Sequence, residues 1–490
     1  MGKPAVVRPC GKLEQYSTAR HALGLNRCVS IAGQYEAPRP LDRQTWEKWI
    51  LTALASVVER EPFLRVGIVD EDSPQPCFVH VPRIDLETQV VWHSAAPCES
   101  DDEYQTQLAR VLESGHDTLW PDIETRPPWK VTIVDRSDGG SSETSRLDIV
   151  YSWHHGIGDG LSGKLFHEFF LSALRENDVP SGHAALESPV LHFQEAPVLP
   201  PPQEEAVNFT LSWWFIAKTI WGEICPSFLA PKVEPAWAGE PIDIHGHFKS
   251  NVGLLFVDGK AIDGVLAVCR MHGTTLTGLV HALTVLSLAR QLPSEKSFKS
   301  GTPMSLRPYV SVPDFNPSKS MSVLVAPFEH SFLPETVGEI QSLLLRSEGG
   351  ATALEEKLWE IAVGVKADLK RGAEQLPADN VMGMIHWVTD WREKFRKMDG
   401  KPTEATFEVS NVGVIAGDGD GGEVKITRLV FSQAKITGTA FNVNIAGCNG
   451  SGGVAITLTW MDGIIEDKVV KGIKNDLGTW LRNLAQHGRL

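Results

Sequence analysis

The chain has 490 residues, of which 42% are hydrophobic and 22% charged, and this composition predicts a large globular protein, not a disordered or collagen-like one. Its 46 basic and 61 acidic residues give a formal net charge of -15, which argues against nucleic acid as a partner. The 7 cysteines include no C-x-x-C pair, so we expect reduced thiols and no disulfide framework.

The first 180 residues alternate helical and extended patterns. Between Asp42 and Arg60, apolar residues recur at steps of three and four, which places them on one face of a helix. Three strand-like patterns and a second helix follow, at residues 63–69, 129–134, 146–153 and 161–175. We therefore expect residues 1–180 to form an α/β lobe.

A proline-rich stretch interrupts this pattern. Six prolines fall between residues 179 and 205, and consecutive prolines fit neither a helix interior nor a sheet ladder, so we predict an interdomain linker at 181–206. Helical patterns resume at 260–272, 274–291, 354–371 and 387–398, and two alternating runs, 441–445 and 454–460, predict an antiparallel hairpin. Residues 207–490 are expected to form a second α/β lobe.

One segment is unusually apolar. Residues 211–230 are rich in Trp, Phe, Ile and Leu, yet Lys218, Glu223 and Pro226 interrupt the run before the ~20 apolar residues that a membrane-spanning helix needs. Packing inside the protein is the simpler explanation. The other explanation is that the segment contacts a membrane surface or lies over the entrance for an apolar substrate.

The residues that directly follow the strand at 146–153 carry the most informative motif. They are His154-His155-Gly156-Ile157-Gly158-Asp159-Gly160, and an amphipathic helix comes next. A turn at the end of a buried strand is where α/β proteins place reactive side chains. This turn is therefore the first candidate for a catalytic or phosphate-binding site.

Three phosphate-binding or nucleophile motifs overlap this turn, and each fits poorly. Gly158 to Gly163 match G-x-G-x-x-G, but a dinucleotide site would have glycine directly after the strand, where two histidines stand here. A P-loop would need Ser or Thr at position 165, which is leucine. A nucleophile elbow would need Gly at position 164, which is lysine.

Acid–base chemistry by histidine fits better. A neutral imidazole can take a proton from a hydroxyl or an amine near neutral pH. Asp159 follows His155 by four residues and can pair within the protein to fix the turn. The residues alone leave a second explanation open, in which both histidines only satisfy hydrogen bonds in the core.

The pattern H-H-x-x-x-D-G resembles that of the superfamily of CoA-dependent acyltransferases and peptide-synthetase condensation domains. Further stretches resemble, in order, the alcohol O-acetyltransferase family of yeasts and filamentous fungi: 13–16, 20–24, 304–308, 409–413 and 431–460. Together they span nearly the whole chain. The D-F-G-W-G box of plant acyltransferases is absent, and Ser410-Asn411-Val412-Gly413 stands in that region, so the plant branch matches less well.

This resemblance implies a fold and a set of roles. The fold would be α/β, with two chloramphenicol-acetyltransferase-like lobes, each a mixed sheet flanked by helices, and a tunnel at their interface. His155 would be the general base and His154 a structural residue. Asp159 would face away from the substrate and pair with Arg307 of the other lobe.

Two further residues are candidate donors to the oxyanion. Ser410 and Asn411 carry a hydroxyl and an amide in the region of the missing plant box, although capping of a turn or a strand end explains them equally well.

The activity that the resemblance implies is acyl-CoA-dependent O-acyl transfer, with acetyl-CoA as co-substrate and an alcohol as acceptor. The acceptor would be a fusel alcohol or a hydroxyl on a terpenoid or polyketide. His155 would remove its proton in a ternary complex, without an acyl-enzyme. The alternatives are an amide-forming or cyclising enzyme of natural-product biosynthesis, and a binding protein that has kept the fold.

No permanently bound cofactor and no metal is expected. His245 and His247 form an H-x-H pair, but no Cys, Asp or Glu cluster completes a site. We expect a cytoplasmic monomer whose partners are the alcohol and the acyl-CoA. Residues 211–230 are the one place for peripheral contact with an internal membrane or a lipid droplet.

Overall fold

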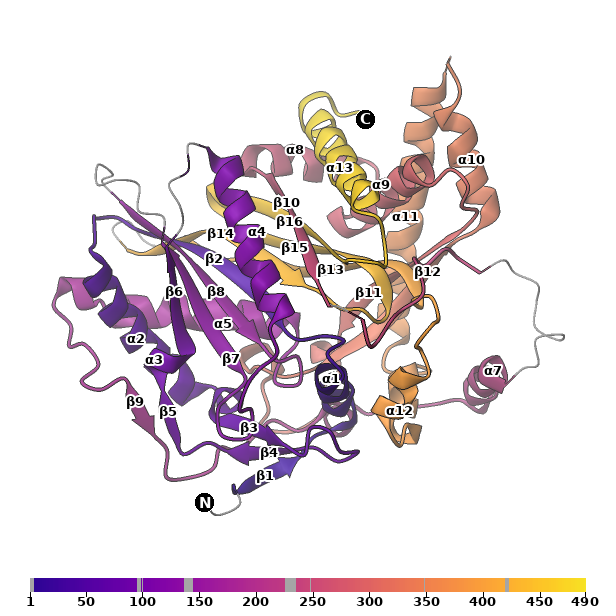
Figure 1. Ribbon diagram of the computed structural model, residues 1–490. Coiled ribbons are helices and arrows are strands. Elements are labelled where there is room, and N and C mark those ends of the chain that lie inside the picture. The colour runs from indigo at the N-terminus through magenta and orange to yellow at the C-terminus, as the bar shows by residue number, and fades with distance from the viewer. Residues whose placement is uncertain are drawn as a thin grey trace.

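Two mixed β-sheets lie side by side in the computed structural model, and helices flank both of them (Figure 1). The structure describes residues 4–94, 98, 100–135, 144–224, 235–246, 248–347, 349–418 and 423–490. The mixed α/β fold class expected from the sequence is confirmed.

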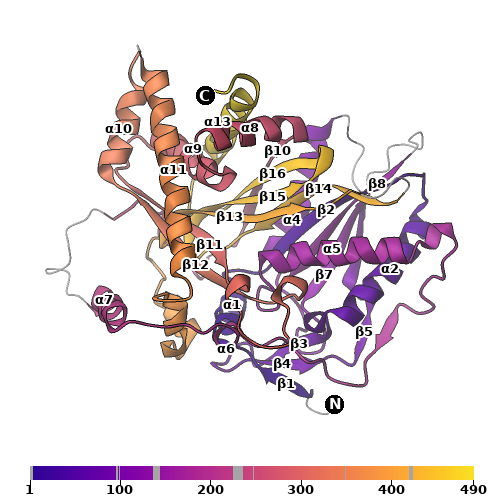
Figure 2. The same ribbon diagram turned by 180° about the vertical axis from the view of Figure 1, so that it is seen from behind.

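The first sheet carries the strand that ends at the histidine motif. Its order is β14-β2-β8-β7-β6, and its strands are β14 (Lys425–Gln433), β2 (Val29–Ala37), β8 (Ser145–Trp153), β7 (Trp129–Asp135) and β6 (Val90–Ser94). Residues 147–153 of the central strand β8 are all buried, because helices cover both faces of the sheet. Two helices, α2 (Arg43–Arg60) and α5 (Gly160–Glu176), pack on each other over one face (Figure 2).

The second sheet has the order β10-β16-β15-β13-β11-β12. Its strands are β10 (Ser250–Val257), β16 (Gly453–Met461), β15 (Thr439–Cys448), β13 (Ala405–Ile415), β11 (Phe298–Ser305) and β12 (Val325–Phe332). The helices α8 (Gly259–Met271), α9 (Leu276–Gln291), α10 (Pro334–Leu344), α11 (Gly350–Gln375) and α13 (Asp467–His487) accompany it. The predicted hairpin is confirmed, since β15 and β16 pair antiparallel.

Smaller elements connect these layers. A three-stranded sheet contains β1 (Val6–Pro9), β4 (Cys77–His80) and β3 (Val66–Val69), and a two-stranded sheet contains β5 (Arg83–Asp85) and β9 (Val190–His192). The remaining α-helices are α1 (Lys12–Ala22), α3 (Leu86–Gln89), α4 (Asp101–Asp117), α6 (Gln203–Ala206), α7 (Trp213–Ile224) and α12 (Trp391–Arg396). Within the proline-rich stretch, β9 pairs with β5 and α6 forms one helical turn.

Strand β14 links the two halves of the chain. It belongs by sequence to the C-terminal half, yet it pairs antiparallel with β2, so that Phe431 lies opposite Ile31. Helix α4 also bridges the sheets, because its buried residues pack with side chains of β2 and β10 in one apolar cluster. The two halves of the chain are therefore joined by backbone hydrogen bonds within the first sheet, and the two sheets are joined by packing.

Two predicted elements differ from the observed ones. The strand predicted at 63–69 begins only at Val66, because residues Pro62–Arg65 form a 3-10 turn that starts at proline. The helix predicted at 387–398 is α-helical only over Trp391–Arg396, where the Asp390 carboxylate accepts hydrogen bonds from the N–H groups of Arg392 and Glu393 and caps the helix.

Candidate active site

Residues 154–160, here called the motif loop, join β8 to α5. The N–H of His154 donates to the carbonyl of Pro128 at 2.9 Å, and the indole Nε1 of Trp153 donates to the carbonyl of Gly158 at 2.8 Å. Helix α5 comes close to β8 because residue 163 is glycine; a Cβ there would lie 2.2 Å from the Trp153 ring. The loop is therefore anchored at both ends by buried contacts.

Asp159 and Arg307 form a buried ion pair between the motif loop and the other half of the chain. Arg307 Nη1 donates to Asp159 Oδ2 at 2.6 Å, and Nη2 donates to Oδ1 at 3.0 Å. The N–H of Ser162 donates to Oδ1 at 2.9 Å, and that of Leu324 donates to Oδ2 at 3.2 Å. Both carboxylate oxygens are thus occupied, as a structural role for Asp159 requires. The residue nevertheless borders the cavity described below, so the expectation that it faces away from the substrate space is wrong.

The surroundings of Asp159 favour its ionised form. Burial alone would raise the pKa of this carboxyl, but the charge and hydrogen bonds of Arg307 and the N–H donors of Ser162 and Leu324 outweigh it and lower the pKa. Asp159 also caps the N-terminus of α5. The pair holds the start of the helix against the 3-10 turn Arg307–Tyr309.

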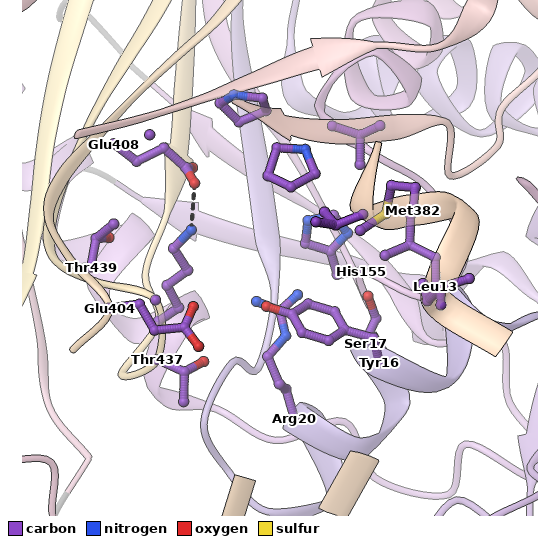
Figure 3. Close-up of a pocket in the computed structure, with 18 of the residues that line it drawn as sticks. Leu13, Tyr16, Ser17, Arg20, His155, Met382, Glu404, Glu408, Thr437 and Thr439 are labelled. Atoms are coloured by element: carbon purple, nitrogen blue, oxygen red, sulfur yellow. Dashed lines mark hydrogen bonds and ion pairs between the residues drawn. The ribbon is translucent and has the colours of Figure 1, made fainter. Parts of the chain in front are cut away.

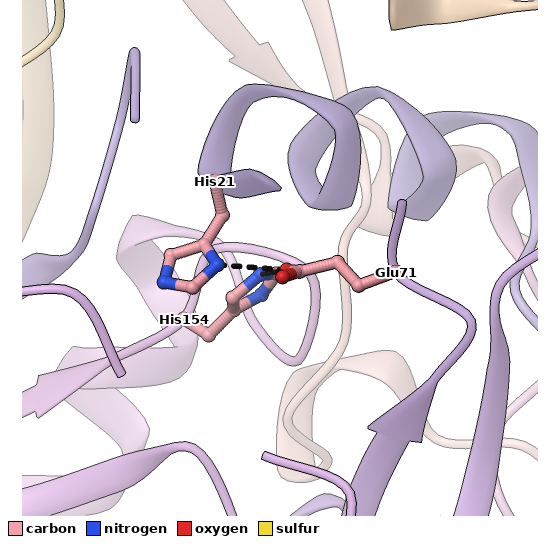
Figure 4. Close-up of side chains that lie close together, drawn as sticks. All are labelled: His21, Glu71 and His154. Atoms are coloured by element: carbon pink, nitrogen blue, oxygen red, sulfur yellow. Dashed lines mark hydrogen bonds and ion pairs between the residues drawn. The ribbon is translucent and has the colours of Figure 1, made fainter. Parts of the chain in front are cut away.

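His154 points toward Glu71 and His21 (Figure 4), and it is not among the residues that line the cavity described below. Its Nε2 lies 3.0 Å from Glu71 Oε1, and His21 Nδ1 lies 2.7 Å from the same oxygen. The N–H of Gly156 donates to His154 Nδ1, and the N–H of Trp120 donates to His21 Nε2. Each imidazole therefore accepts at one nitrogen and donates its single proton to Glu71 through the other.

This arrangement also decides whether the cluster fits a metal. His21, Glu71 and His154 have ligand atoms within 4.8 Å of one another, as a metal site would need. A metal requires a free lone pair on each imidazole. Here the lone pairs of both rings accept backbone N–H groups, and the other two nitrogens are the donors to Glu71. The cluster is a hydrogen-bonded support for the motif loop and does not fit a metal centre.

His155 lines a cavity of about 760 Å³ between the two sheets (Figure 3). The walls come from α1, the motif loop, α7, β11, β12, α12, β13 and β14. Nδ1 of His155 is buried and has no partner on another described residue, whereas Nε2 is not among the buried unpartnered atoms and is the ring nitrogen left for the cavity. Of the predicted histidine pair, the second residue faces the cavity and the first supports the loop.

The surroundings of His155 keep its imidazole neutral. Burial lowers the pKa of this imidazole to about 4, and the positive charge of Arg20 acts in the same direction. Contact with its own backbone carbonyl and the charge of Asp159 act in the opposite direction. At neutral pH the ring therefore carries a free lone pair, which a base needs.

The two candidate oxyanion donors lie in different places. Ser410 of β13 lines the cavity and is buried. Asn411 is exposed, and its amide donates to Thr277 Oγ1 at 3.1 Å, while its side-chain oxygen accepts from the N–H of Gly413 at 2.8 Å. The capping explanation therefore accounts for Asn411.

Sequence reasoning missed Glu71 and gave Arg20 no role. Glu71 lies in the acidic turn after β3, and nothing local distinguishes it from a surface residue. Arg20 carries a signal only in its place on α1, one residue before His21. Both residues gain their importance from contacts with the motif loop, far away in the sequence.

Helix α7 corrects the expectation that the apolar segment packs inside the protein. Trp213 and Trp214 are 86% and 79% exposed, and Trp221 is 55% exposed. Thr219 and Ile220 of the same helix line the cavity. The helix lies apart from both sheets (Figure 1), and residues 225–230 of the predicted segment are outside the described residues. Among the helices of the described ranges, we find none long and apolar enough to cross a membrane.

The chain is similar to several known proteins. A family model described as alcohol acetyltransferase matches residues 98–473. The probable alcohol acetyltransferase FCK4 of Fusarium pseudograminearum is 32% identical over 499 residues, which cover 100% of this chain and 97% of that protein. The probable alcohol acetyltransferase crmB of Aspergillus fumigatus is 24% identical, with 96% of this chain and 98% of that one covered.

Solved structures share the fold at low sequence identity. The trichothecene 15-O-acetyltransferase TRI3 from Fusarium sporotrichioides superposes with a TM-score of 0.70 at 13% identity, and 99% of this chain and 95% of that chain are covered. The condensation domain of the Monacolin K polyketide synthase MokA gives a TM-score of 0.57 at 14% identity, with 100% and 98% covered. The two-lobed acyltransferase architecture is therefore the one found here.

Proposed function

Because the chain belongs to the alcohol acetyltransferase family and is thus an acyltransferase, we propose that it transfers an acetyl group from acetyl-CoA to an alcohol, with His155 as the general base. The observation that carries this proposal is the place of His155. It is the histidine of the motif that lines the cavity of about 760 Å³, whereas His154 is held by Glu71.

The reaction follows from this geometry. Nε2 of His155 takes the proton of the acceptor hydroxyl as its oxygen attacks the thioester carbonyl carbon, so a C–O bond forms. The tetrahedral intermediate then collapses, the C–S bond breaks, and the imidazolium returns the proton to the departing thiolate. Both substrates occupy the cavity together, and no acyl-enzyme is needed because the oxygen attacks the thioester directly.

The acceptor is an apolar alcohol in this proposal. Apolar and aromatic side chains supply most of the cavity wall on the side of α12 and the 3-10 segment Val381–Trp387, among them Met382, Ile385 and Phe395. The similar protein TRI3 is a trichothecene 15-O-acetyltransferase, which supports a hydroxyl group on a bulky natural product as the acceptor.

An acceptor screen tests this function. The purified chain is incubated with acetyl-CoA and a panel of terpenoid, polyketide and small aliphatic alcohols, and mass spectrometry records the acetyl ester while a thiol reagent records free CoA. We expect equal amounts of ester and CoA, and a rate for His155→Ala that is lower by about 100-fold or more. A His155→Ala variant that turns over at nearly the wild-type rate would contradict the assignment.

We also propose that α7 rests on the surface of a neutral lipid bilayer and supplies apolar acceptors to the cavity. Tryptophan side chains favour the boundary between water and lipid, and three of them are exposed on a helix whose Thr219 and Ile220 line the cavity. The net charge of -15 disfavours an anionic surface. A zwitterionic bilayer is therefore the partner in this proposal.

Flotation with phosphatidylcholine vesicles tests the contact. We expect the wild-type chain to float with the vesicles and the variant with Trp213→Ser and Trp214→Ser to remain in the soluble fraction. Leu345→Ser is the matched control, because Leu345 is 88% exposed but follows α10, away from α7. Equal flotation of all three proteins, or of none, would contradict a role of α7.

A further inference from the structure

Arg20 of α1 is a buried cation without a counterion. Its side chain is on the cavity wall, the residue is 4% exposed, and its Nε is fully buried with no hydrogen-bond partner among the described residues. No carboxylate in the part of the chain that the structure describes forms an ion pair with it. The nearby Arg8 shows the usual solution, a bidentate pair with Glu14 at 2.7 and 2.8 Å.

Three of the four described acidic residues that line the cavity are engaged elsewhere, and the fourth, Glu404, is exposed and forms no ion pair with Arg20. Asp159 is saturated by Arg307 and two N–H groups. Glu408 accepts from Lys435 at 2.9 Å and from Gln433 at 2.8 Å, and Glu329 pairs with Lys299 at 2.8 Å. A buried guanidinium with no such partner is costly unless a ligand supplies the anion.

The protein nevertheless holds Arg20 in place. Its guanidinium stacks on the ring of Tyr16 at 4.2 Å from the centroid, which leaves its N–H groups free to donate in the plane. Helix α1 packs on the motif loop, since Thr18 Cγ2 lies 3.5 Å from where a Cβ on Gly156 would stand. Figure 3 shows Arg20 and His155 on the wall of the same cavity, and the charge of Arg20 acts on the His155 ring.

We propose that Arg20 donates hydrogen bonds to the oxyanion of the tetrahedral intermediate and is the second catalytic residue beside His155. This inference rests on the proposed function. The oxyanion forms on the carbon that the acceptor oxygen attacks, while the proton of that oxygen moves to His155 Nε2. Arg20 lines the same cavity as His155, and its charge acts on the His155 ring, so in this proposal its N–H groups donate to the oxygen on which the charge develops.

This role explains why Arg20 lacks a partner in the free protein. The thioester carbonyl is neutral, and it becomes negative only as the C–O bond forms. When the C–S bond breaks, the electron pair returns to the carbonyl and the negative charge leaves on sulfur. A protein carboxylate on Arg20 would neutralise the cation before that moment, so an unpaired guanidinium is the useful arrangement.

Steady-state kinetics of Arg20→Gln and Arg20→Lys test the role. We expect the kcat of Arg20→Gln to fall by about 100-fold or more, with both KM values within a few-fold of wild type, and Arg20→Lys to retain part of the activity. Guanidinium or methylguanidinium ions added to Arg20→Ala should restore turnover. Arg27→Gln is the matched control, because Arg27 also stacks on an aromatic ring, Phe248, at 4.2 Å but does not line the cavity.

The dependence of kcat/KM on pH provides a second measurement, which a merely structural role of Arg20 would not change. The charged groups that face His155 are Arg20, Asp159 and Lys435. Removal of the positive charge in Arg20→Gln should move the acidic limb of kcat/KM to higher pH. Arg27→Gln should leave that limb in place.

The outcomes separate this inference from the proposed function. A change in KM alone would show that Arg20 binds an anionic group of a substrate in the ground state and would overturn the inference, as would an unchanged kcat. If His155→Ala is inactive while Arg20→Gln is active, only the role of Arg20 fails. If His155→Ala remains active, the proposed function fails first. If Arg20→Gln does not fold, the activity of Arg20→Lys and the rescue of Arg20→Ala by guanidinium test the role of Arg20 instead.

Discussion

The two sides of the motif loop differ in how their polar groups are satisfied. His154, which is not part of the cavity wall, has a partner at each ring nitrogen, and Asp159, which borders the cavity, accepts hydrogen bonds at both carboxylate oxygens. On the cavity side, neither the His155 ring nor the Arg20 guanidinium forms a hydrogen bond with another described residue. Adjacent residues of one short turn thus lie in opposite environments.

This difference distinguishes the polar groups that support the loop from those that are available to a substrate. Buried polar groups that are fully hydrogen-bonded define one conformation of a loop, whereas polar groups left open toward a cavity remain available to a substrate. The two histidines differ in role because their rings point in different directions: His154 supports the loop, and His155 lines the cavity. It also means that changes on the supporting side should affect stability, and changes on the cavity side should affect turnover.

The largest stability effect is expected from Arg307→Ala. It leaves the Asp159 carboxylate buried without its cation, which should lower the free energy of unfolding by about 3–5 kcal/mol in urea titrations. Arg39→Ala is the control, because Arg39 pairs with Asp178 at 2.9 Å near the surface and should cost about 1 kcal/mol or less. Equal costs for the two variants would mean that the buried pair does not support the loop.

A smaller loss is expected from Glu71→Ala. The variant removes the acceptor that His21 and His154 share, so two buried N–H groups lose their partner. We expect a loss of about 2–4 kcal/mol in the free energy of unfolding, and a smaller loss for Glu71→Gln, which retains an acceptor oxygen. A loss in Glu71→Ala below about 0.5 kcal/mol would contradict a supporting role for this cluster.

The smallest effect concerns the acid sensitivity of the cavity side. Burial lowers the pKa of His155 to about 4, below the value of about 6.5 in the unfolded chain, so the unfolded state binds the proton first as pH falls. This histidine thus stabilises the fold above pH 6.5, and that contribution is lost as pH falls toward 4. Between pH 7.5 and 5.5, wild type should lose about 1 kcal/mol more than His155→Gln. Urea titrations at both values measure this difference, and parallel losses would show that His155 is not held neutral.

Local patterns were sufficient to predict the elements that present the site. The apolar spacing of α2 and α5 and the alternation in β8 and β15–β16 predict these elements close to their observed bounds, because each buries one face or both against a sheet. The family resemblance predicted that His155 is the general base and that Asp159 pairs with Arg307. The structure places the charged ends of Asp159 and Arg307 in contact.

Features that depend on distant contacts could not be predicted in this way. Glu71 looks like any acidic turn residue until His21 and His154 are placed beside it. The exposure of Trp213 and Trp214 contradicts their composition, since apolar content alone favours burial. Neither property is encoded in the neighbouring residues, which is where periodicity and propensity act.

Strand β14 has a consequence for how the protein is made. Until a ribosome has synthesised the chain as far as Gln433, strand β2 of the first sheet has an unpaired edge, although its own residues end at Ala37. An open edge invites pairing with other chains. The first sheet is therefore expected to remain incomplete during translation, and the cavity that His155 lines is expected to form only after β14 has paired with β2.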